Sequence, residues 1–280
     1  MATENTPWGR NVLVEFEDRI AWVMFNRPEK RNCMSPALNQ EMLATLEALE
    51  TDDRCGVLVL TGVGEAWSAG MDLREYFAEM ENASDIVKYK TQRAAGDWQW
   101  RKLRDYYKPT IAMVNGWCFG GAFTPLVACD LAIASEDAVF GLSEINWGIL
   151  PAGNVSKMVA DTMGLRDGLY YIMTGETFDG RKAAEMKLIN EAVPAEKLKE
   201  RVTELARILL AKNQTTLRCA KEVYKRISSM DWDTASDYIY AKVAEAMFKG
   251  GNKFKQKAMK AFLEEKTFRP GLETFREKED

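Results

Sequence analysis

The stretch that decides the fold reads TIAMVNGWCFGGAFTPLVACDLAIA and spans residues 110–134. An apolar run at 110–114 predicts a strand, a glycine-rich turn follows at 115–121, and the next residues continue as a helix that ends near Asp130. A second apolar run at 131–134 predicts another strand. This strand–helix–strand order is typical of an α/β core with parallel strands.

The glycine turn can bind a ligand as well as reverse the direction of the chain. Glycine lets a ligand approach the backbone closely, and a helix start offers free N–H groups that can hold a negative charge. The N–H of Gly121 can therefore face a developing oxyanion, although a tight turn alone also explains the pair Gly120-Gly121. Glycine recurs in WSAGMD at 67–72, where Met71 can supply a second N–H. Two such turns fit an oxyanion hole, because it needs two donors.

Other patterns place strands and helices before this stretch. The segments VLVEFE at 12–17 and IAWVMFN at 20–26 predict a β-hairpin around Asp18-Arg19. Further elements predicted before residue 110 are a helix opening at Ser35-Pro36, a buried strand at 57–60, a loop at 64–72 and a helical segment at about 84–107.

The character of the chain changes near residue 197. From there the pattern predicts only helices: an amphipathic one through residues 202–210, then segments at about 214–228, 233–248 and 253–265. The sequence therefore predicts a core domain at 1–196 and a helical C-terminal region at 197–280.

Composition limits the class of protein and its partners. A chain of 280 residues with 46% hydrophobic and 29% charged side chains fits a soluble globular protein. The net charge of −4 argues against a nucleic-acid partner, which usually requires a basic excess. No apolar run approaches membrane-spanning length, and the first residues lack the charged start and apolar core of a signal peptide. We therefore expect a cytoplasmic protein without a membrane or nucleic-acid partner.

The chain contains no histidine, which removes the commonest general base and the commonest metal ligand. Ser-His-Asp and Cys-His catalysis are thereby excluded, and proton transfer must use Asp, Glu, Lys, Tyr, Cys or water. We expect no metal site. The five cysteines form no CxxC pair and are expected to be reduced, mostly buried thiols: Cys33, Cys55, Cys118, Cys129 and Cys219.

Glu144 is the carboxylate that the sequence favours for proton transfer. It lies in GLSEINWG at 141–148, between Leu142 and Trp147. A carboxylate in apolar company tends toward a raised pKa, which suits acid–base chemistry near neutral pH. The alternative is a glutamate in a surface turn.

Some tyrosines and cations are candidates for substrate contacts. Tyr76, Tyr238 and Tyr240 can bind a polar group at the far end of an aromatic substrate, or they can simply pack with their hydroxyls satisfied. Lys30 and Arg31 can meet phosphates, or they can belong to a solvated turn.

Taken together, these segments resemble the crotonase, or enoyl-CoA hydratase/isomerase, superfamily over nearly the whole chain. The resemblance implies a spiral of ββα units with a C-terminal helical trimerisation region, and acyl-CoA thioester substrates. It also implies that the N–H groups of Met71 and Gly121 hold the thioester oxygen. The motifs that carry it are NRPEKRN at 26–32, WSAGMDL at 67–73, the glycine turn, CDLAIA at 129–134 and FGLSE at 140–144.

The chain departs from the ordinary fatty-acyl hydratases of this superfamily at Thr124. Those enzymes carry one glutamate there and a second at the position of Glu144. This departure resembles the subgroup of hydroxycinnamoyl-CoA (feruloyl-CoA) hydratase-lyases, which usually has serine at the position of Thr124. The subgroup also resembles this chain in WCFGG at 117–121, LSEINWGI at 142–149 and DYIYAK at 237–242.

The resemblance to this subgroup implies an activity. Feruloyl-CoA and related 4-hydroxycinnamoyl-CoA thioesters would be hydrated and then cleaved by a retro-aldol step to vanillin-type aldehydes and acetyl-CoA. Another enoyl-CoA hydratase or isomerase reaction, and a non-catalytic binding protein of this fold, are the alternatives. No cofactor is implied beyond the coenzyme A of the substrate, and a homotrimer or a dimer of trimers is expected.

The resemblance also assigns roles to individual residues. Glu144 would transfer protons alone, while Thr124 would at most position water. The implied substrate contacts are Tyr76, Tyr240, Trp147 and Tyr238. The implied coenzyme A contacts are Lys30, Arg31, Ser68, Ala69, Gly70, Asp72, Phe262 and Lys266.

Overall fold

The computed structural model describes residues 8–276. The N-terminal residues 1–7, on which the expectation about a signal peptide rests, and the charged residues 277–280 lie outside that range. The chain divides into two compact units, Met1–Glu204 and Leu205–Asp280. This division falls inside helix α7 (Leu198–Leu210), whereas the sequence predicts it just before that helix.

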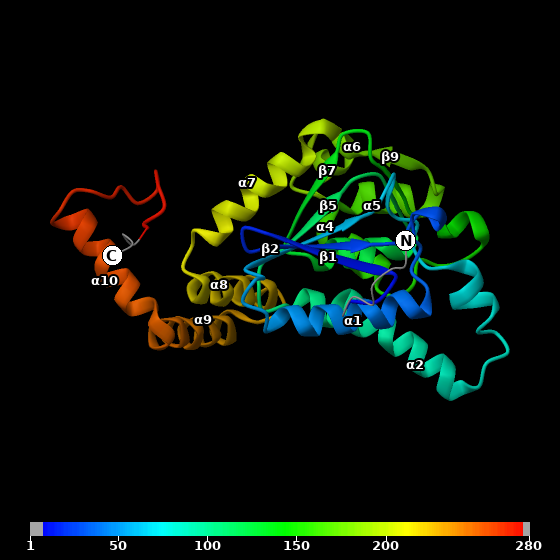
Figure 1. The fold of residues 1–280 in the computed structure, drawn as a ribbon, viewed down its shortest axis with the longest axis horizontal. Coiled ribbons are helices and arrows are strands. Elements are labelled where there is room, and N and C mark those ends of the chain that lie inside the picture. The colour runs from blue at the N-terminus through cyan, green and yellow to red at the C-terminus, as the bar shows by residue number, and fades with distance from the viewer. Residues whose placement is uncertain (1–7, 277–280) are drawn as a thin grey trace. The chain divides into compact units, whose positions relative to one another are not determined.

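A six-stranded sheet forms the centre of the first unit (Figure 1). The predicted hairpin is confirmed, because β1 and β2 pair antiparallel across the left-handed residues Asp18 and Arg19. The predicted parallel core is also confirmed, since every further neighbouring pair in this sheet is parallel. In sheet order the strands are β1 (Val12–Glu17), β2 (Ile20–Phe25), β3 (Val57–Gly62), β5 (Thr110–Val114), β7 (Leu131–Ser135) and β10 (Glu191–Val193).

A second sheet of four very short strands carries the turns that matter for function. Its strands in order are β4 (Ala66–Ser68), β6 (Trp117–Phe119), β8 (Val139–Gly141) and β9 (Thr177–Asp179). The prediction of a continuous loop at 64–72 is therefore wrong in part. Three residues are too few to show an alternating pattern, and β4 is held by its parallel pairing with β6.

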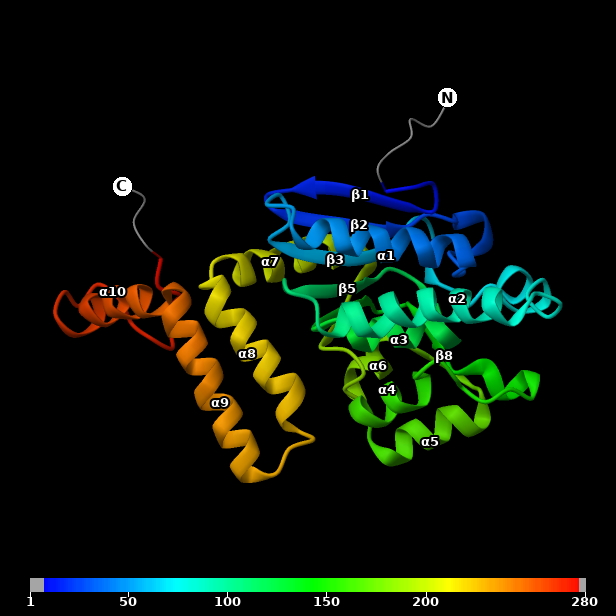
Figure 2. The same ribbon diagram turned by 90° about the horizontal axis from the view of Figure 1, so that it is seen from below.

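Helices cover the main sheet, and Figures 1 and 2 show α1 and α2 on the same side of it. Helix α1 begins where predicted, with the Ser35 hydroxyl capping the N–H of Leu38. Burial of each of its large apolar side chains contributes about 1.5–3 kcal/mol to the stability of the fold. The helices of this unit are α1 (Pro36–Glu50), α2 (Asp85–Gly96), α3 (Phe123–Ala128), α4 (Val155–Thr162), α5 (Leu165–Thr174) and α6 (Gly180–Glu185).

Three aromatic side chains of the core fix the second sheet to the first. The rings of Trp67 in β4 and of Trp98 lie 5.4 Å and 6.0 Å from the ring of Phe25 in β2. The Trp67 indole N–H also donates to the Leu60 carbonyl at 3.1 Å. The turns that follow β4 therefore start from a rigid base.

The second unit is helical among its described residues, as predicted. Helices α8 (Gln214–Ile227) and α9 (Trp232–Ala246) pack on each other, and a break at Lys249 and Gly250 separates α9 from α10 (Asn252–Leu263). Buried Arg218 of α8 forms ion pairs with Glu222 of the same helix and with Glu245 of α9, each at 2.6 Å, and the second of these joins the two helices.

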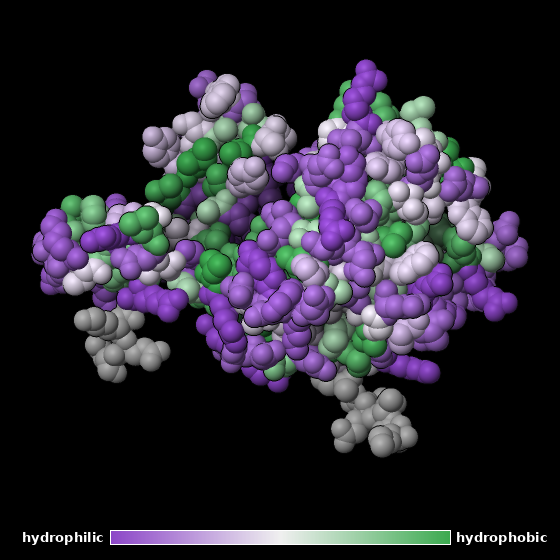
Figure 3. Space-filling model, turned by 90° about the horizontal axis from the view of Figure 1, so that it is seen from above, coloured by the Kyte–Doolittle hydropathy of each residue, from purple (hydrophilic) through white to green (hydrophobic). Residues whose placement is uncertain are grey.

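The face of the molecule seen in Figure 3 is mostly hydrophilic with scattered hydrophobic side chains. Hydrophobic side chains also reach the surface of the second unit. Those of the second unit include Trp232, Tyr240 and Phe248. Within residues 8–276, no helix is both long and apolar enough to cross a membrane.

Candidate active site

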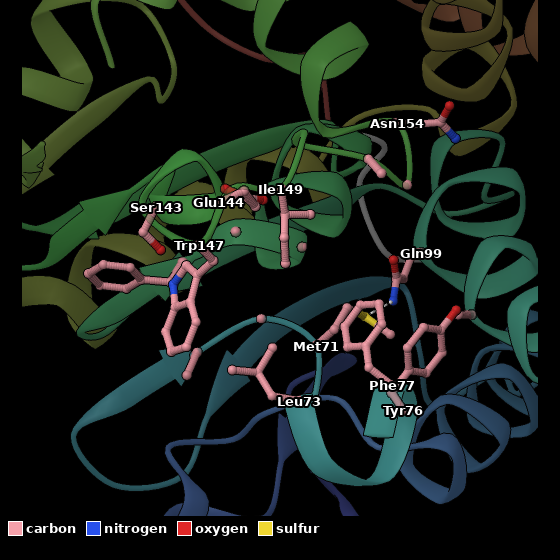
Figure 4. A pocket seen from close by; sticks show the side chains of 18 of the residues that line it. Met71, Leu73, Tyr76, Phe77, Gln99, Ser143, Glu144, Trp147, Ile149 and Asn154 are labelled. Carbon is pink, nitrogen blue, oxygen red and sulfur yellow. Dashed lines mark hydrogen bonds between the residues drawn. The ribbon is translucent and has the colours of Figure 1, made fainter. Parts of the chain in front are cut away.

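A cavity of about 610 Å³ opens in the first unit. Figure 4 shows side chains of the segment 143–149, among them Glu144 and Trp147, on one side of it and Met71, Leu73 and Tyr76 on another. The predicted glycine turns, Glu144 and Tyr76 are thus brought together. The segments that line the cavity are parts of 69–77, 92–100, 117–121 and 143–154, together with Arg31.

The two glycine turns place the N–H groups of Met71 and Gly121 beside each other. A Cβ on Gly121 would lie 3.5 Å from the Met71 nitrogen, and one on Gly70 would lie 3.2 Å from the Gly121 nitrogen. Gly70 has a φ of +88°, and its Cβ would also meet the Phe119 carbonyl oxygen at 2.6 Å, so glycine is required there. Two adjacent N–H donors in one cavity can hold the oxygen of a thioester and its enolate.

The backbone around Met71 shows where its N–H points. Met71 forms an isolated parallel bridge to Met34. That bridge uses the carbonyl of Gly70, which accepts from Met34, and the N–H of Asp72, which donates to Met34. The Met71 N–H takes no part in this bridge, and it points away from Met34.

Glu144 reaches the same place from the 3-10 turn Ser143–Trp147, which follows β8. A Cβ on Gly120, whose φ is +51°, would lie 3.1 Å from Glu144 Oε1. Among the described residues, Glu144 Oε2 is buried without a hydrogen-bond partner. Burial raises the pKa of Glu144, as its apolar company in the sequence predicts. A half-buried carboxylate in this position can accept and return a proton.

Asp72 is held in a network that was not predicted. Its carboxylate accepts from Arg27 at 2.9 Å, from the Cys33 thiol at 3.2 Å, and from the N–H groups of Arg74 and Glu75 at 3.0 Å and 2.9 Å. Burial alone would raise its pKa, but these hydrogen bonds lower the pKa of Asp72 to about 2. The side chain fixes the turn after Met71 and is absent from the cavity lining.

The predicted coenzyme A contacts fall into two groups. Ala69, Gly70 and Arg31 line the cavity, and the Arg31 guanidinium lies 4.6 Å from the ring centre of Trp117. Ser68 does not line it, because its hydroxyl is buried and donates to the Asn32 carbonyl at 2.9 Å.

Lys30, like Ser68, does not line the cavity. Its ammonium donates to Glu75 at 2.8 Å, and this hydrogen bond raises the pKa of Lys30. Phe262 and Lys266 lie in the second unit, with the Lys266 ammonium 5.9 Å from the Phe262 ring centre, and neither lines the cavity.

Thr124 does not fit the role of handling water directly. The side chain is fully buried, and its hydroxyl donates to the Gly153 carbonyl at 2.8 Å. Gly153 lines the cavity and Thr124 does not. Thr124 therefore fixes a piece of the wall from behind.

The aromatic candidates are also divided. Tyr76 lines the cavity, and burial raises its pKa. Trp147 lines it too and is 66% exposed. Tyr238 and Tyr240 lie in the second unit and are not part of this lining, and Tyr240 is 73% exposed.

Several lining residues have no signal in the sequence as site residues. Gln99 and Trp100 belong to a polar segment that predicts only a helix. Trp117 and Phe119 lie in the quoted glycine stretch, and their stacked rings, 5.3 Å apart, could have been suspected from their alternation there. Across residues 8–276, no cluster of three or more Cys, Asp and Glu side chains is arranged to hold a metal ion.

Comparison with known proteins defines the class. The sequence profile of the family described as enoyl-CoA hydratase/isomerase matches residues 15–271, and the chain belongs to this family. The crotonase fold expected from the resemblance is confirmed. The solved enoyl-CoA hydratase of Mycobacterium smegmatis superposes with a TM-score of 0.82 at 24% identity, covering 91% of this chain and 96% of that chain.

One relative is much more similar in sequence. The hydroxycinnamoyl-CoA hydratase-lyase of Pseudomonas fluorescens is 56% identical over 276 residues, which cover 99% of this chain and 100% of the relative. The 2,3-dehydroadipyl-CoA hydratase of Escherichia coli strain K12 is 29% identical over 215 residues, covering 77% and 82% of the two chains.

Proposed function

We propose that this protein is a lyase that hydrates feruloyl-CoA and related 4-hydroxycinnamoyl-CoA thioesters and then cleaves them to vanillin-type aldehydes and acetyl-CoA. The near full-length identity of 56% to a hydroxycinnamoyl-CoA hydratase-lyase supports the substrate class. One observation carries the mechanism: among the described residues that line the cavity, Glu144 is the only carboxylate, and it lies beside the two N–H donors.

In the hydration step, the thioester oxygen accepts hydrogen bonds from the N–H groups of Met71 and Gly121. The carboxylate of Glu144 takes a proton from water, and the water oxygen bonds to the β-carbon. The electron pair of the double bond moves into the thioester, forming an enolate in the oxyanion hole. The carboxylic acid of Glu144 then returns the proton to the α-carbon. Each N–H donor is expected to contribute about 3–4 kcal/mol to stabilising the enolate-like transition state.

In the cleavage step, Glu144 removes the proton of the β-hydroxyl group. The bond between the α- and β-carbons breaks as the aldehyde carbonyl forms, and the bonding pair becomes the enolate of acetyl-CoA. The same two N–H groups hold that enolate until Glu144 protonates its α-carbon. The raised pKa of Glu144 suits a group that must alternate between proton acceptor and donor.

The remaining contacts extend this proposal. Tyr76 and Trp147 would meet the aromatic ring, while Arg31, Ala69 and Gly70 would meet coenzyme A at the cavity. Lys30, Ser68 and Asp72 would support that wall through their contacts within the protein. Thr124 would hold the wall at Gly153.

The second unit would act through assembly. We propose a cytoplasmic homotrimer or dimer of trimers, supported by the large exposed hydrophobic side chains of this unit. In that assembly Tyr238 and Tyr240 would contact the aromatic substrate, and Phe262 and Lys266 would contact coenzyme A, at the site of a neighbouring subunit. Sedimentation analysis of the purified protein tests the assembly, and a monomer at micromolar concentration would contradict it.

The activity is tested with purified protein and a panel of aromatic and aliphatic enoyl-CoA thioesters. Feruloyl-CoA should yield vanillin and acetyl-CoA in equal amounts, measured by chromatography. Release of the β-hydroxyacyl-CoA alone, or faster turnover of the aliphatic thioesters, would favour an ordinary hydratase or isomerase instead.

A further inference from the structure

Gln99 is a buried polar side chain in the wall of the cavity. It lies in the π-helical turn Asp97–Lys102, is 5% exposed, and lines the cavity beyond Met71 (Figure 4). The side-chain hydrogen bonds of Gln99 among the described residues are all donated by Nε2. The acceptors are Asn39 Oδ1 at 3.3 Å, Met71 Sδ at 3.4 Å and Met34 Sδ at 3.6 Å.

The neighbours of Gln99 fix which end of its amide faces the cavity. An indole N–H can only donate a hydrogen bond. Trp98 Nε1 donates to Asn39 Oδ1 at 2.7 Å, so Asn39 must present its oxygen there. Gln99 must then offer its NH₂ group to that same oxygen. Trp98 and Asn39 are both fully buried, which holds this arrangement in place. Among the described residues Gln99 Oε1 accepts no hydrogen bond and is not a buried unpaired atom, so it remains open to the cavity that Gln99 lines.

The surroundings suit a flat ring with one polar substituent. Tyr76, Phe77, Ala95 and Trp100 line the cavity together with Gln99. When a ligand displaces water from a carbonyl oxygen in an apolar wall and supplies no hydrogen-bond donor, the unpaired oxygen weakens binding of the ligand. A ligand that brings a hydroxyl group avoids this loss.

We propose that Gln99 is a specificity-determining residue, whose Oε1 accepts a hydrogen bond from a hydroxyl group on the aromatic ring of the acyl chain. This inference rests on the proposed function, because it assumes an aromatic acyl group in the cavity. It assigns the preference for hydroxylated over unsubstituted rings to a residue on the Asp97–Lys102 turn.

The test compares Gln99→Leu with Gln92→Leu. Gln92 also lines the cavity but is exposed, and it makes a matched control. The value of kcat/KM for hydration is measured with 4-hydroxycinnamoyl-CoA and with cinnamoyl-CoA. In Gln99→Leu the ratio of the two values should fall about tenfold, the effect of one lost hydrogen bond. In Gln92→Leu the ratio should change less than about twofold.

Equal losses with both thioesters in Gln99→Leu would overturn the proposal, because they would indicate a role in folding alone. A binding measurement separates this outcome from failure of the proposed function. In the Glu144→Gln background, calorimetry should show tighter binding of 4-hydroxycinnamoyl-CoA than of cinnamoyl-CoA, and Gln99→Leu should remove that preference. The parent protein could turn over neither thioester, while Glu144→Gln still prefers 4-hydroxycinnamoyl-CoA and Gln99→Leu removes that preference. In that case the role of Gln99 stands and the proposed function fails.

Discussion

Two carboxylates flank the oxyanion hole, and they are treated in opposite ways by the fold. Asp72 directly follows Met71 and accepts hydrogen bonds from Arg27, from Cys33 and from two backbone N–H groups. Glu144 lies against Gly120 on the other turn, and its Oε2 is buried without a partner among the described residues. One carboxylate is saturated with donors, and the other is left short of them.

The difference in partners explains the difference in pKa. Burial disfavours the charge of both groups, but the donors around Asp72 outweigh burial and lower its pKa to about 2. Among the described residues, Glu144 Oε2 has no such donor, and burial raises the pKa of Glu144. A carboxylate whose charge is satisfied fixes geometry, whereas one that lacks partners can exchange a proton with substrate.

The largest expected effect is on kcat, from substitution of Glu144, the carboxylate that lacks hydrogen-bond donors. Glu144→Gln keeps the shape of the side chain but cannot take a proton, so kcat should fall by about a hundredfold to ten-thousandfold. Its stability should be unchanged or slightly higher, because no partner is lost. Asp72→Asn should show the reverse, with a clear loss of stability and a smaller loss of kcat. Turnover assays and urea unfolding of both variants check this, and similar losses of kcat in both would break the comparison.

The next largest effect is expected from Arg27→Leu, on the satisfied side. This change removes the nearest cation of the buried Asp72, leaves only the Lys30 ammonium at 4.0 Å, and should lower the free energy of unfolding by about 3–5 kcal/mol. Arg54→Leu is the matched control, because Arg54 pairs with Asp52 at the surface, and it should cost at most about 1 kcal/mol. Urea unfolding measures both. Equal losses would show that the Arg27 pair does not hold the turn.

The fold was largely predictable because its main signals are local. The β1–β2 hairpin and the strands around the glycine turn carry their own apolar patterns. The strands β4, β6, β8 and β9 have three residues each and no readable period, so their existence depends on pairing with distant strands.

The site was predictable only where a motif contains the residue. Glu144, Met71 and Gly121 stand within quoted motifs, and the structure brings them together. The network of Asp72 depends on Arg27, 45 residues away, and the orientation of Gln99 depends on Asn39, 60 residues away. No local pattern records such partners, which is why Lys30 and Asp72 were expected at the ligand and Gln99 was not.

The two carboxylates should also give opposite dependences of stability on pH. The native pKa of Asp72 lies below its ordinary 3.8, so its stabilisation is present above pH 3.8 and is lost as the pH falls toward 2. That contribution is about 2 kcal/mol. The native pKa of Glu144 lies above its ordinary 4.5, so the native state binds more protons, and stability falls as the pH rises from 4.5 through that value.

Unfolding free energies measured from pH 2 to pH 8 separate these contributions. Asp72→Asn should flatten the loss between pH 3.8 and 2, and Glu144→Gln should remove a decline that begins above pH 4.5. If Glu144→Gln instead lowered stability increasingly above pH 4.5, Glu144 would have a stabilising partner, contrary to the comparison.

Thr124 gives the smallest expected effect and the finest test of the same rule. Its hydroxyl is satisfied by the Gly153 carbonyl, so it belongs with Asp72 as a group that fixes geometry. Thr124→Val keeps the volume but removes the hydrogen bond, and should cost about 1 kcal/mol of stability and lower kcat about threefold. Thr124→Ser keeps the hydrogen bond and should hold kcat within about twofold, although losing a buried methyl costs about 1 kcal/mol.

Because both variants lose similar stability, only kcat distinguishes the hydrogen bond from simple packing. Turnover of feruloyl-CoA by both variants, beside their urea unfolding, measures this. If Thr124→Val lost as much activity as Glu144→Gln, the hydroxyl would have to touch the reacting water. A hydrogen bond to a protein partner would then not distinguish side chains that fix the geometry of the site from side chains that take part in the reaction.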